Sequence, residues 1–313
     1  MSTTPLQPVP SPSRAAAMPP PARSARRFTL VMTALVAVLL PTEFFLGRPL
    51  RVVRFGVTPN VVAGLLLIAA LVAYCRWRPL PRLVESCTLA LWTAFLANAL
   101  SVLIQIAGRS PRPLIDAQLA RMDGRLHFQT AAVVRFAAHL PSLSIALGMV
   151  YELVGAFILA AVLLLPFLGY AEAARRYVMS AAFGIVIAAI VFAFWPAAGP
   201  WTTEAFRPNP FQADVTAYLA LLKSHAPVAL DMKRAAIVAF PSIHVLLALL
   251  SAVALSSIRR LRIVIWILAI AMCFSTLTTG WHYLMDVFGG IGLTVIAVAL
   301  ARVALPSDPP TPS

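Results

Sequence analysis

Charged side chains are scarce in this sequence. Asp, Glu, Lys and Arg make up 12% of the 313 residues, against 60% hydrophobic residues, whereas about a quarter of an ordinary soluble domain is charged. The composition therefore excludes a soluble globular protein and indicates an integral membrane protein.

Cysteine is also rare. The three cysteines, Cys75, Cys87 and Cys273, lie within or at the ends of apolar runs, and their spacing matches no metal site. We expect free thiols packed as small apolar side chains. The sequence has no glycine-rich nucleotide-binding loop and no internal repeat, so we expect neither a nucleotide site of that kind nor a repeat architecture.

Acidic residues are so few that the net charge is +14. A strongly basic chain can bind nucleic acid, but most of these arginines flank apolar runs and no basic-aromatic patch is present. Contact with anionic lipid headgroups explains the charge better. We therefore expect no nucleic-acid partner.

Long apolar runs dominate the chain. Eight of them are long enough to cross a hydrocarbon core of about 30 Å, which predicts an all-α, polytopic membrane protein. The first run contains Pro41 and Glu43, and the sixth is short. The predicted spans are residues 28–46, 57–75, 87–107, 144–170, 177–196, 240–258, 263–280 and 283–305.

Arginines in short loops set the predicted orientation, because cytoplasmic loops retain an excess of positive charge. With the N-terminus inside, the predicted cytoplasmic loops contain Arg76, Arg78, Arg82, Arg175, Arg176, Arg259, Arg260 and Arg262. The arginine-containing loop at 48–54 falls on the opposite side, so the register of the first two spans stays open. The last six spans place the loop 197–239 outside. Segment 110–141 is predicted to form an amphipathic helix in the outer interface, and 213–224 a short surface helix.

Two polar motifs interrupt the apolar runs on that outer side: Pro241-Ser242-Ile243-His244 and His282-Tyr283-Leu284-Met285-Asp286. A spacing of four residues puts His282 and Asp286 on one helix face, so the carboxylate can accept a hydrogen bond from the ring and fix its tautomer. Two histidines and a carboxylate at one membrane surface are a plausible acid and nucleophile for phosphoryl chemistry.

Each motif also has a structural interpretation. His282 could begin a helix within an aromatic belt formed by Trp281 and Tyr283, although such a histidine needs no carboxylate partner. The Pro241 motif could be an ordinary helix start, or a start whose free N–H groups and Ser242 hydroxyl bind phosphate.

A third motif, Trp195-Pro196-Ala197-Ala198-Gly199-Pro200-Trp201, ends the fifth predicted span. The order of these three motifs resembles the type 2 phosphatidic acid phosphatase superfamily, and within it the branch that includes inositol phosphorylceramide synthases. The resemblance is specific over 191–290 and weaker over 116–151, where Asp116, Leu119, Asp123 and Phe128 match an upstream segment of that branch.

The resemblance implies metal-independent catalysis without a cofactor. His282 would be the nucleophile that forms a phosphohistidine, oriented by Asp286. His244 would be the general acid and then the base, and Ser242 would bind phosphoryl oxygens. The implied domains are a disordered Pro-rich cytoplasmic tail (1–27), two N-terminal membrane helices (28–86), a six-helix catalytic membrane domain (87–305) and a disordered tail (306–313).

The sequence departs from the wider superfamily in two places, and both departures remove cations. Thr276 stands where that superfamily has an arginine, and the first motif lacks its Lys and Arg-Pro. Lys233 and Arg234 are the candidate phosphate-binding cations, with Lys223 and Arg207 behind them. For each of these, a solvated or headgroup-facing charge is the alternative.

The sequence thus predicts a lipid phosphatase or phosphotransferase that acts on a membrane lipid at the non-cytoplasmic face. Water as acceptor gives hydrolysis, and an alcohol such as inositol gives transfer; the sequence does not choose between them. The alternative is a transporter or scaffold that retains the fold, with Glu43 and Glu152 on a transport path. The absence of paired broken helices argues against that alternative.

Overall fold

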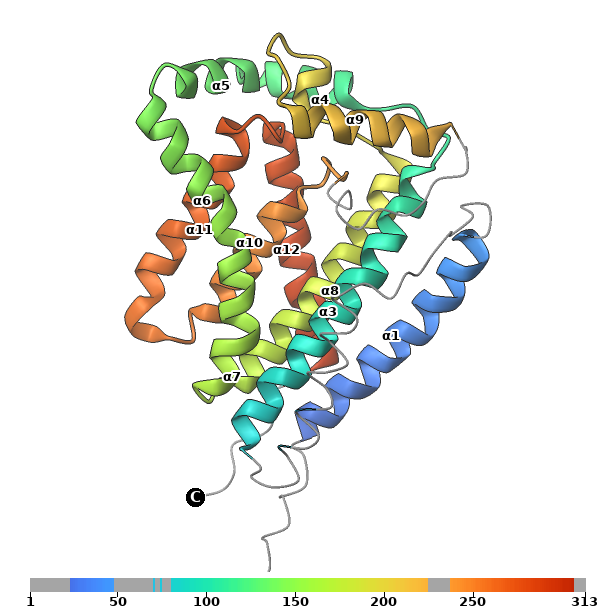
Figure 1. The fold of residues 1–313 in the computed structure, drawn as a ribbon, viewed down its shortest axis with the longest axis vertical. Coiled ribbons are helices and arrows are strands. Elements are labelled where there is room, and N and C mark those ends of the chain that lie inside the picture. Colours follow the sequence, from blue (N-terminus) through green and yellow to red (C-terminus); the bar gives the residue numbers. More distant parts are fainter. Residues whose placement is uncertain (1–22, 48–69, 71–73, 75–79, 225–236, 307–313) are drawn as a thin grey trace, which may run out of the picture.

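The computed structural model describes residues 23–47, 70, 74, 80–224 and 237–306. These residues form an all-helical bundle with no strand among them, which confirms the predicted fold class (Figure 1). The long helices lie roughly along one direction, and three short helices cover one end of the bundle.

Six helices in the described part of the chain are long and apolar enough to cross a membrane. They correspond to six of the eight predicted spans. The long helices are α1 (Arg23–Gly47), α3 (Pro81–Gly108), α6 (Pro141–Leu159), α8 (Ala171–Phe194), α11 (Arg262–Thr278) and α12 (Leu284–Ala304). A π-helical turn (Ala160–Leu164) and α7 (Leu165–Phe167) extend α6, and a 3-10 turn (Arg259–Leu261) precedes α11.

The remaining two predicted spans have different outcomes. The span 240–258 is a 13-residue helix, α10 (Ile243–Leu255), which is about 20 Å long and does not cross a 30 Å core. It is shorter than the apolar run because Ser242 caps its start by accepting a hydrogen bond from the Val245 N–H. The span 57–75 lies outside the described residues apart from two isolated positions.

The two segments predicted to lie in the outer interface are helical, as predicted, but with different boundaries. The segment 110–141 contains two helices, α4 (Asp116–Arg125) and α5 (Thr130–Ala138). The predicted helix 213–224 begins earlier, as α9 (Pro210–Lys223). Its start is fixed by a capping box in which the Asn209 and Gln212 side chains each accept from the other residue's backbone N–H. A 3-10 turn (Pro200–Thr202) lies between α8 and α9.

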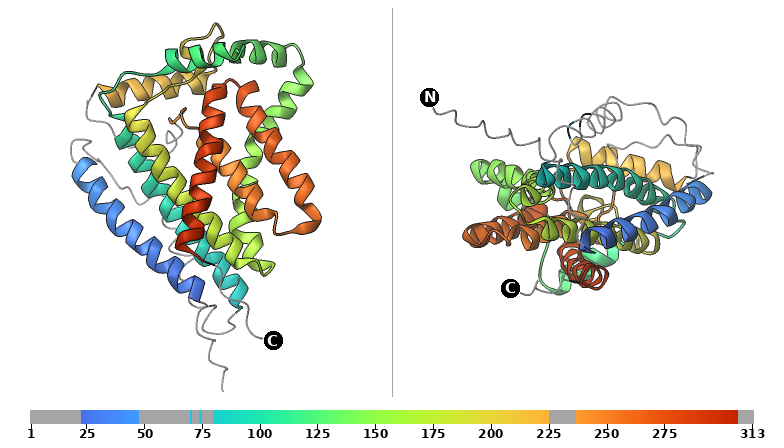
Figure 2. Two further views of the ribbon diagram at one scale, coloured as in Figure 1. Left: turned by 180° about the vertical axis from the view of Figure 1, so that it is seen from behind. Right: turned by 90° about the horizontal axis from the view of Figure 1, so that it is seen from below.

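Helix α8 lies at the centre of the bundle and packs against α3, α10 and α12 (Figure 2). Its buried residues, such as Met179, join Leu100, Leu246 and Ala297 in one apolar core. The outer faces of the long helices are apolar too: Val303 is 81% exposed. Apolar exposure of this kind is costly in water and ordinary in lipid, so the structure describes an integral membrane protein.

Helices α10 and α12 approach closely at Gly290. The Ser242 N–H donates to the Asp286 carbonyl over 3.1 Å, which places the start of α10 beside the first turn of α12. A Cβ atom at position 290 would lie 2.7 Å from the Ser242 carbonyl oxygen. Only glycine leaves this approach undisturbed, and the approach brings the two polar motifs together.

We expect Gly290→Ala to separate α10 from α12. Overpacking of this kind costs roughly 1–3 kcal/mol, so the thermal unfolding midpoint of the detergent-solubilised protein should fall. Gly292→Ala is the matched control, because a Cβ there meets no atom within 4 Å. Equal unfolding midpoints for the two variants would show that the close approach is unimportant.

Candidate functional site

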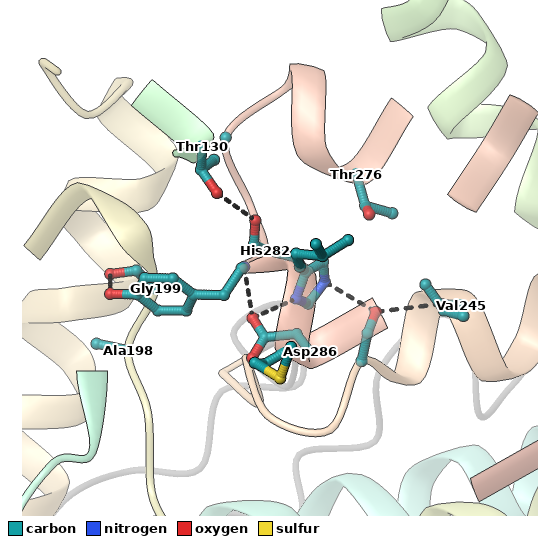
Figure 3. A network of polar contacts seen from close by, with 12 residues as sticks. Thr130, Ala198, Gly199, Val245, Thr276, His282 and Asp286 are labelled. Atoms are coloured by element: carbon teal, nitrogen blue, oxygen red, sulfur yellow. Dashed lines mark hydrogen bonds and ion pairs between the residues drawn. The ribbon is translucent and has the colours of Figure 1, made fainter. Parts of the chain in front are cut away.

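The two polar motifs meet at the covered end of the bundle (Figure 3). The His282 ring lies between Asp286 on one side and Ser242 on the other. Its Nδ1 is 3.2 Å from Asp286 Oδ2, and its Nε2 is 3.1 Å from the Ser242 hydroxyl. The structure thus brings together three of the residues that the sequence predicts for the site.

The hydrogen bonds around His282 are consistent with one assignment of the protons on the ring and on the Ser242 hydroxyl. Asp286 Oδ2 also accepts from the Tyr283 N–H over 2.9 Å, and as a carboxylate it accepts from His282 Nδ1–H. The Ser242 hydroxyl accepts from the Val245 N–H over 3.2 Å, which leaves its own proton for His282 Nε2. This network assigns the Nδ1–H tautomer, with the Nε2 lone pair facing Ser242.

His282 is neutral in this environment. Its side chain is almost fully buried, and burial lowers its pKa to about 4, against a weaker opposing effect of a backbone hydrogen bond to Ala239. The contact with Asp286 is therefore a hydrogen bond that the neutral ring donates from Nδ1–H to the carboxylate. A neutral imidazole with an unprotonated Nε2 is the form that can attack phosphorus.

His244, the other predicted catalytic histidine, lies in the first turn of α10. Its ring stacks on Tyr151 of α6, with centroids 4.0 Å apart and planes 17° from parallel, and it hydrogen-bonds to the Tyr151 backbone. His244 Nε2 is buried and has no hydrogen-bond partner among the described residues, so the backbone bond belongs to Nδ1. Sequence reasoning missed Tyr151 because the two positions are over ninety residues apart.

Both histidines line one cavity of about 320 Å³. Among the described residues, the cavity wall contains no lysine or arginine, and no cluster of three or more His, Cys, Asp or Glu could hold a metal ion. His244 therefore has a ring nitrogen without a partner among the described residues, and its side chain lines the same cavity as His282. The structure thus brings both predicted catalytic histidines to one cavity.

Two buried carboxylates of α4 hold the site together. Asp116 accepts from the N–H groups of Ala198 and Gly199, over 3.0 and 2.8 Å. Asp123 accepts from the N–H groups of Leu284 and Met285, over 2.7 and 3.0 Å. Burial raises the pKa of both aspartates, and these backbone bonds lower it in part.

The turn that Asp116 binds is the third motif of the sequence. Gly199 has a φ of 142°, a conformation that favours glycine, and a Cβ there would lie 2.3 Å from the Trp201 ring. The Tyr283 hydroxyl donates to Asp116 over 3.3 Å. The 195–201 turn is thereby tied to the start of α12, beside His282.

The predicted phosphate-binding cations are not brought to the cavity. Lys233 and Arg234 lie outside the described residues. Lys223 donates to the carbonyls of Ser110 and Arg112 over 2.9 and 2.7 Å, and burial lowers its pKa. Its ammonium therefore fixes the end of α9.

Two further positions supply no cation to the site. Arg207 is exposed and does not line the cavity. The hydroxyl of Thr276 donates to the Cys273 carbonyl of its own helix over 2.7 Å.

The intramembrane glutamates also lie away from the cavity. Glu152 is exposed on α6, Glu43 is part of α1, and neither lines the cavity that contains the histidines. The described structure therefore does not connect them in one path.

Comparison with known proteins identifies a family. A family model described as the PAP2 superfamily matches residues 117–300, which is more than half of the chain and includes all three motifs. Helices α1 and α3 precede the matched residues. Searches of curated proteins and of solved structures found no match. The superfamily generally comprises lipid phosphatases. The chain therefore belongs to the PAP2 superfamily.

Proposed function

We propose that this protein transfers the phosphoryl group of a membrane lipid through a phosphohistidine on His282. The observation that carries the proposal is the assignment of protons around His282, together with His244, which lines the same cavity and whose Nε2 has no partner among the described residues. Splitting one difficult displacement into two easier ones is the advantage of a covalent intermediate.

In the first step, His282 Nε2 attacks phosphorus while the bond from phosphorus to the lipid alkoxide breaks. His244, which takes up a proton when the phosphate dianion binds beside its buried ring, donates its Nε2 proton to the leaving oxygen. The Asp286 carboxylate stabilises the positive charge that develops on the His282 ring, because it accepts the Nδ1 hydrogen. The Ser242 hydroxyl, released from Nε2, donates to a phosphoryl oxygen.

In the second step, neutral His244 removes a proton from the acceptor, whose oxygen attacks phosphorus and breaks the P–N bond. His282 returns to its neutral Nδ1–H form. Water as acceptor releases phosphate, whereas an alcohol such as inositol gives a new phosphoester.

We place this chemistry at the non-cytoplasmic face. Helices α10 and α12 begin at the site, so the short connections that contain several arginines lie at the other end of the bundle. These arginines are Arg175 and Arg176 at the start of α8, and Arg259, Arg260 and Arg262 before α11. Arginines in short loops favour the cytoplasmic side.

We expect His282→Ala to abolish covalent labelling of the protein by a ³²P-labelled phosphate ester. His244→Ala should lower kcat by roughly 10²- to 10⁴-fold. With a nitrophenyl ester, whose leaving group needs no proton, His244→Ala should instead accumulate acid-labile label on His282. His139→Ala is the matched control, because His139 is exposed at the end of α5. Labelling that persists in His282→Ala would contradict the proposal.

The acceptor is tested with a lipid phosphate monoester labelled in its phosphate, with and without inositol. Label in free phosphate indicates hydrolysis, and label in a water-soluble inositol phosphate that depends on inositol indicates transfer. Both products should disappear in His282→Ala, because both pass through the same intermediate.

Tyr151 should act as a positioning residue for His244. Tyr151→Phe retains the stacked ring and should retain kcat, whereas Tyr151→Leu should lower kcat with little change in KM and shift the pH profile of lipid phosphate turnover. Nitrophenyl ester cleavage should be affected less, since its first step needs no acid. Equal losses on both substrates would assign Tyr151 a structural role only.

A further inference from the structure

A second, smaller cavity lies at the end of the bundle opposite the histidines. Its volume is about 150 Å³, and it lies between the start of α8 and the ends of α10 and α12. The other ends of these three helices adjoin the 195–201 turn, His244 and His282. The cavity therefore touches the helices that position the site, but it has no part in the proposed reaction.

Two arginines line this second cavity. Arg302 is exposed in the last turn of α12, and Arg176 lies in the second turn of α8. Arg176 forms an ion pair with Glu172, whose Oε1 lies 2.6 Å from Arg176 Nη2. Glu172 does not line the cavity, and neither does any other acidic side chain of the described residues. The wall of the cavity is therefore cationic.

Hydroxyl groups accompany the arginines. Ser180, Ser257 and Tyr177 line the cavity. The Tyr177 hydroxyl and the neighbouring Ser251 hydroxyl are buried, and neither has a partner outside this pair among the described residues. Guanidinium and hydroxyl groups are the donors that bind phosphate oxygens. The polar part of the wall thus fits a phosphate group.

The rest of the wall is apolar. A free phosphate ion would gain nothing from aliphatic side chains, whereas a phospholipid carries hydrocarbon close to its phosphate and gains free energy when that hydrocarbon is buried. The combination of a cationic part and an apolar part therefore favours a phospholipid. The aliphatic lining residues are Ala173, Leu250, Val253, Ala254, Val298 and Ala301.

The cavity also lies at the depth of lipid headgroups. Helix α12 has 21 residues, so it is about 32 Å long and matches a hydrocarbon core of about 30 Å. Because the His282 motif lies at one end of α12, Arg302 in its last turn lies near the opposite membrane surface. Basic pockets between membrane helices at such a surface bind anionic headgroups.

The volume limits the headgroup. A cavity of roughly 150 Å³ holds one benzene molecule, and a phosphate group is of similar size. The second cavity, at about 150 Å³, thus has room for one phosphate and not for a headgroup that carries several.

We propose that this cavity binds the phosphate of an anionic phospholipid in the leaflet opposite the histidines, with Arg302 and Arg176 as its cations. The bound lipid contacts α8, α10 and α12 together, so it stabilises the packing of these helices. The inference goes beyond the proposed function and does not depend on it.

The test is a titration of the detergent-solubilised protein with phosphatidylglycerol, followed by the thermal unfolding midpoint. A ligand that binds only the folded state stabilises it by mass action, so the midpoint should rise and level off. Phosphatidylcholine should raise it less at each concentration. Arg302→Gln should increase the half-saturating concentration of phosphatidylglycerol by roughly 10- to 100-fold, the loss expected for a hydrogen bond between charged groups. Equal curves for the wild type and Arg302→Gln would overturn the proposal.

Arg260→Gln is the matched control. Arg260 lies at the same end of the bundle, is exposed like Arg302, and does not line the cavity, so its variant should keep the wild-type half-saturating concentration. An equal loss in Arg260→Gln would indicate general attraction to basic residues and would overturn the site. His282→Ala should respond as the wild type does. A lost response in His282→Ala would instead place the lipid in the cavity of the histidines and also overturn the proposal.

A crosslinking measurement on the wild type covers the case in which Arg302→Gln does not fold. The protein is irradiated with phosphatidylglycerol that carries a diazirine near the start of one chain. Crosslinks to residues 173–180, 250–257 or 298–302, competed by phosphatidylglycerol and not by inorganic phosphate, support the proposal. Crosslinks confined to other segments overturn it. Competition by inorganic phosphate at the same concentration would show a site for free phosphate and would overturn the assignment to a lipid.

Discussion

The site depends on one backbone contact, the hydrogen bond from the Ser242 N–H to the Asp286 carbonyl. Because Gly290 has no side chain, the start of α10 can lie directly against α12. The same contact places the Ser242 hydroxyl at His282 Nε2, while Asp286 holds Nδ1. A shift of either helix would therefore disturb the His282 ring, the Asp286 carboxylate and the Ser242 hydroxyl at once.

A second layer of the structure supports this contact from outside the bundle. The buried Asp123 carboxylate accepts two of the first N–H groups of α12, at Leu284 and Met285. Backbone N–H groups offset the cost of burying such a charge, and in return the carboxylate fixes the helix start beside His282. These N–H groups are then occupied, so they are not available to a phosphate. The groups that neutralise the phosphate must come from elsewhere.

Much of the fold was predictable because long apolar runs identify membrane helices without knowledge of their packing. The exception is α10, since counting apolar residues over 240–258 does not take into account the cap that Ser242 forms. The four-residue spacing was sufficient to predict the contact between His282 and Asp286. Ser242 was predicted at the site as a phosphate ligand, and the structure gives it a hydrogen bond to His282; binding of phosphate stays a prediction.

Other parts of the site could not be predicted from spacing. The stack of Tyr151 on His244 and the bonds of Asp116 to the 195–201 turn join positions about eighty or more residues apart. Such contacts depend on how helices pack, which no local pattern encodes. The resemblance pointed to Asp116 and Asp123 as family positions, but only their geometry shows that they bind backbone N–H groups.

The shortness of α10 has a consequence for the membrane itself. Helix α10 is about 20 Å long, so it does not cross roughly one third of a hydrocarbon core of about 30 Å. The start of α10 lies at the cavity that His244 and His282 line, together with residues of α3, α8 and α9. Protein side chains thus take the place of lipid in part of that thickness, and in the proposed reaction the charged phosphate need not be transferred into hydrocarbon.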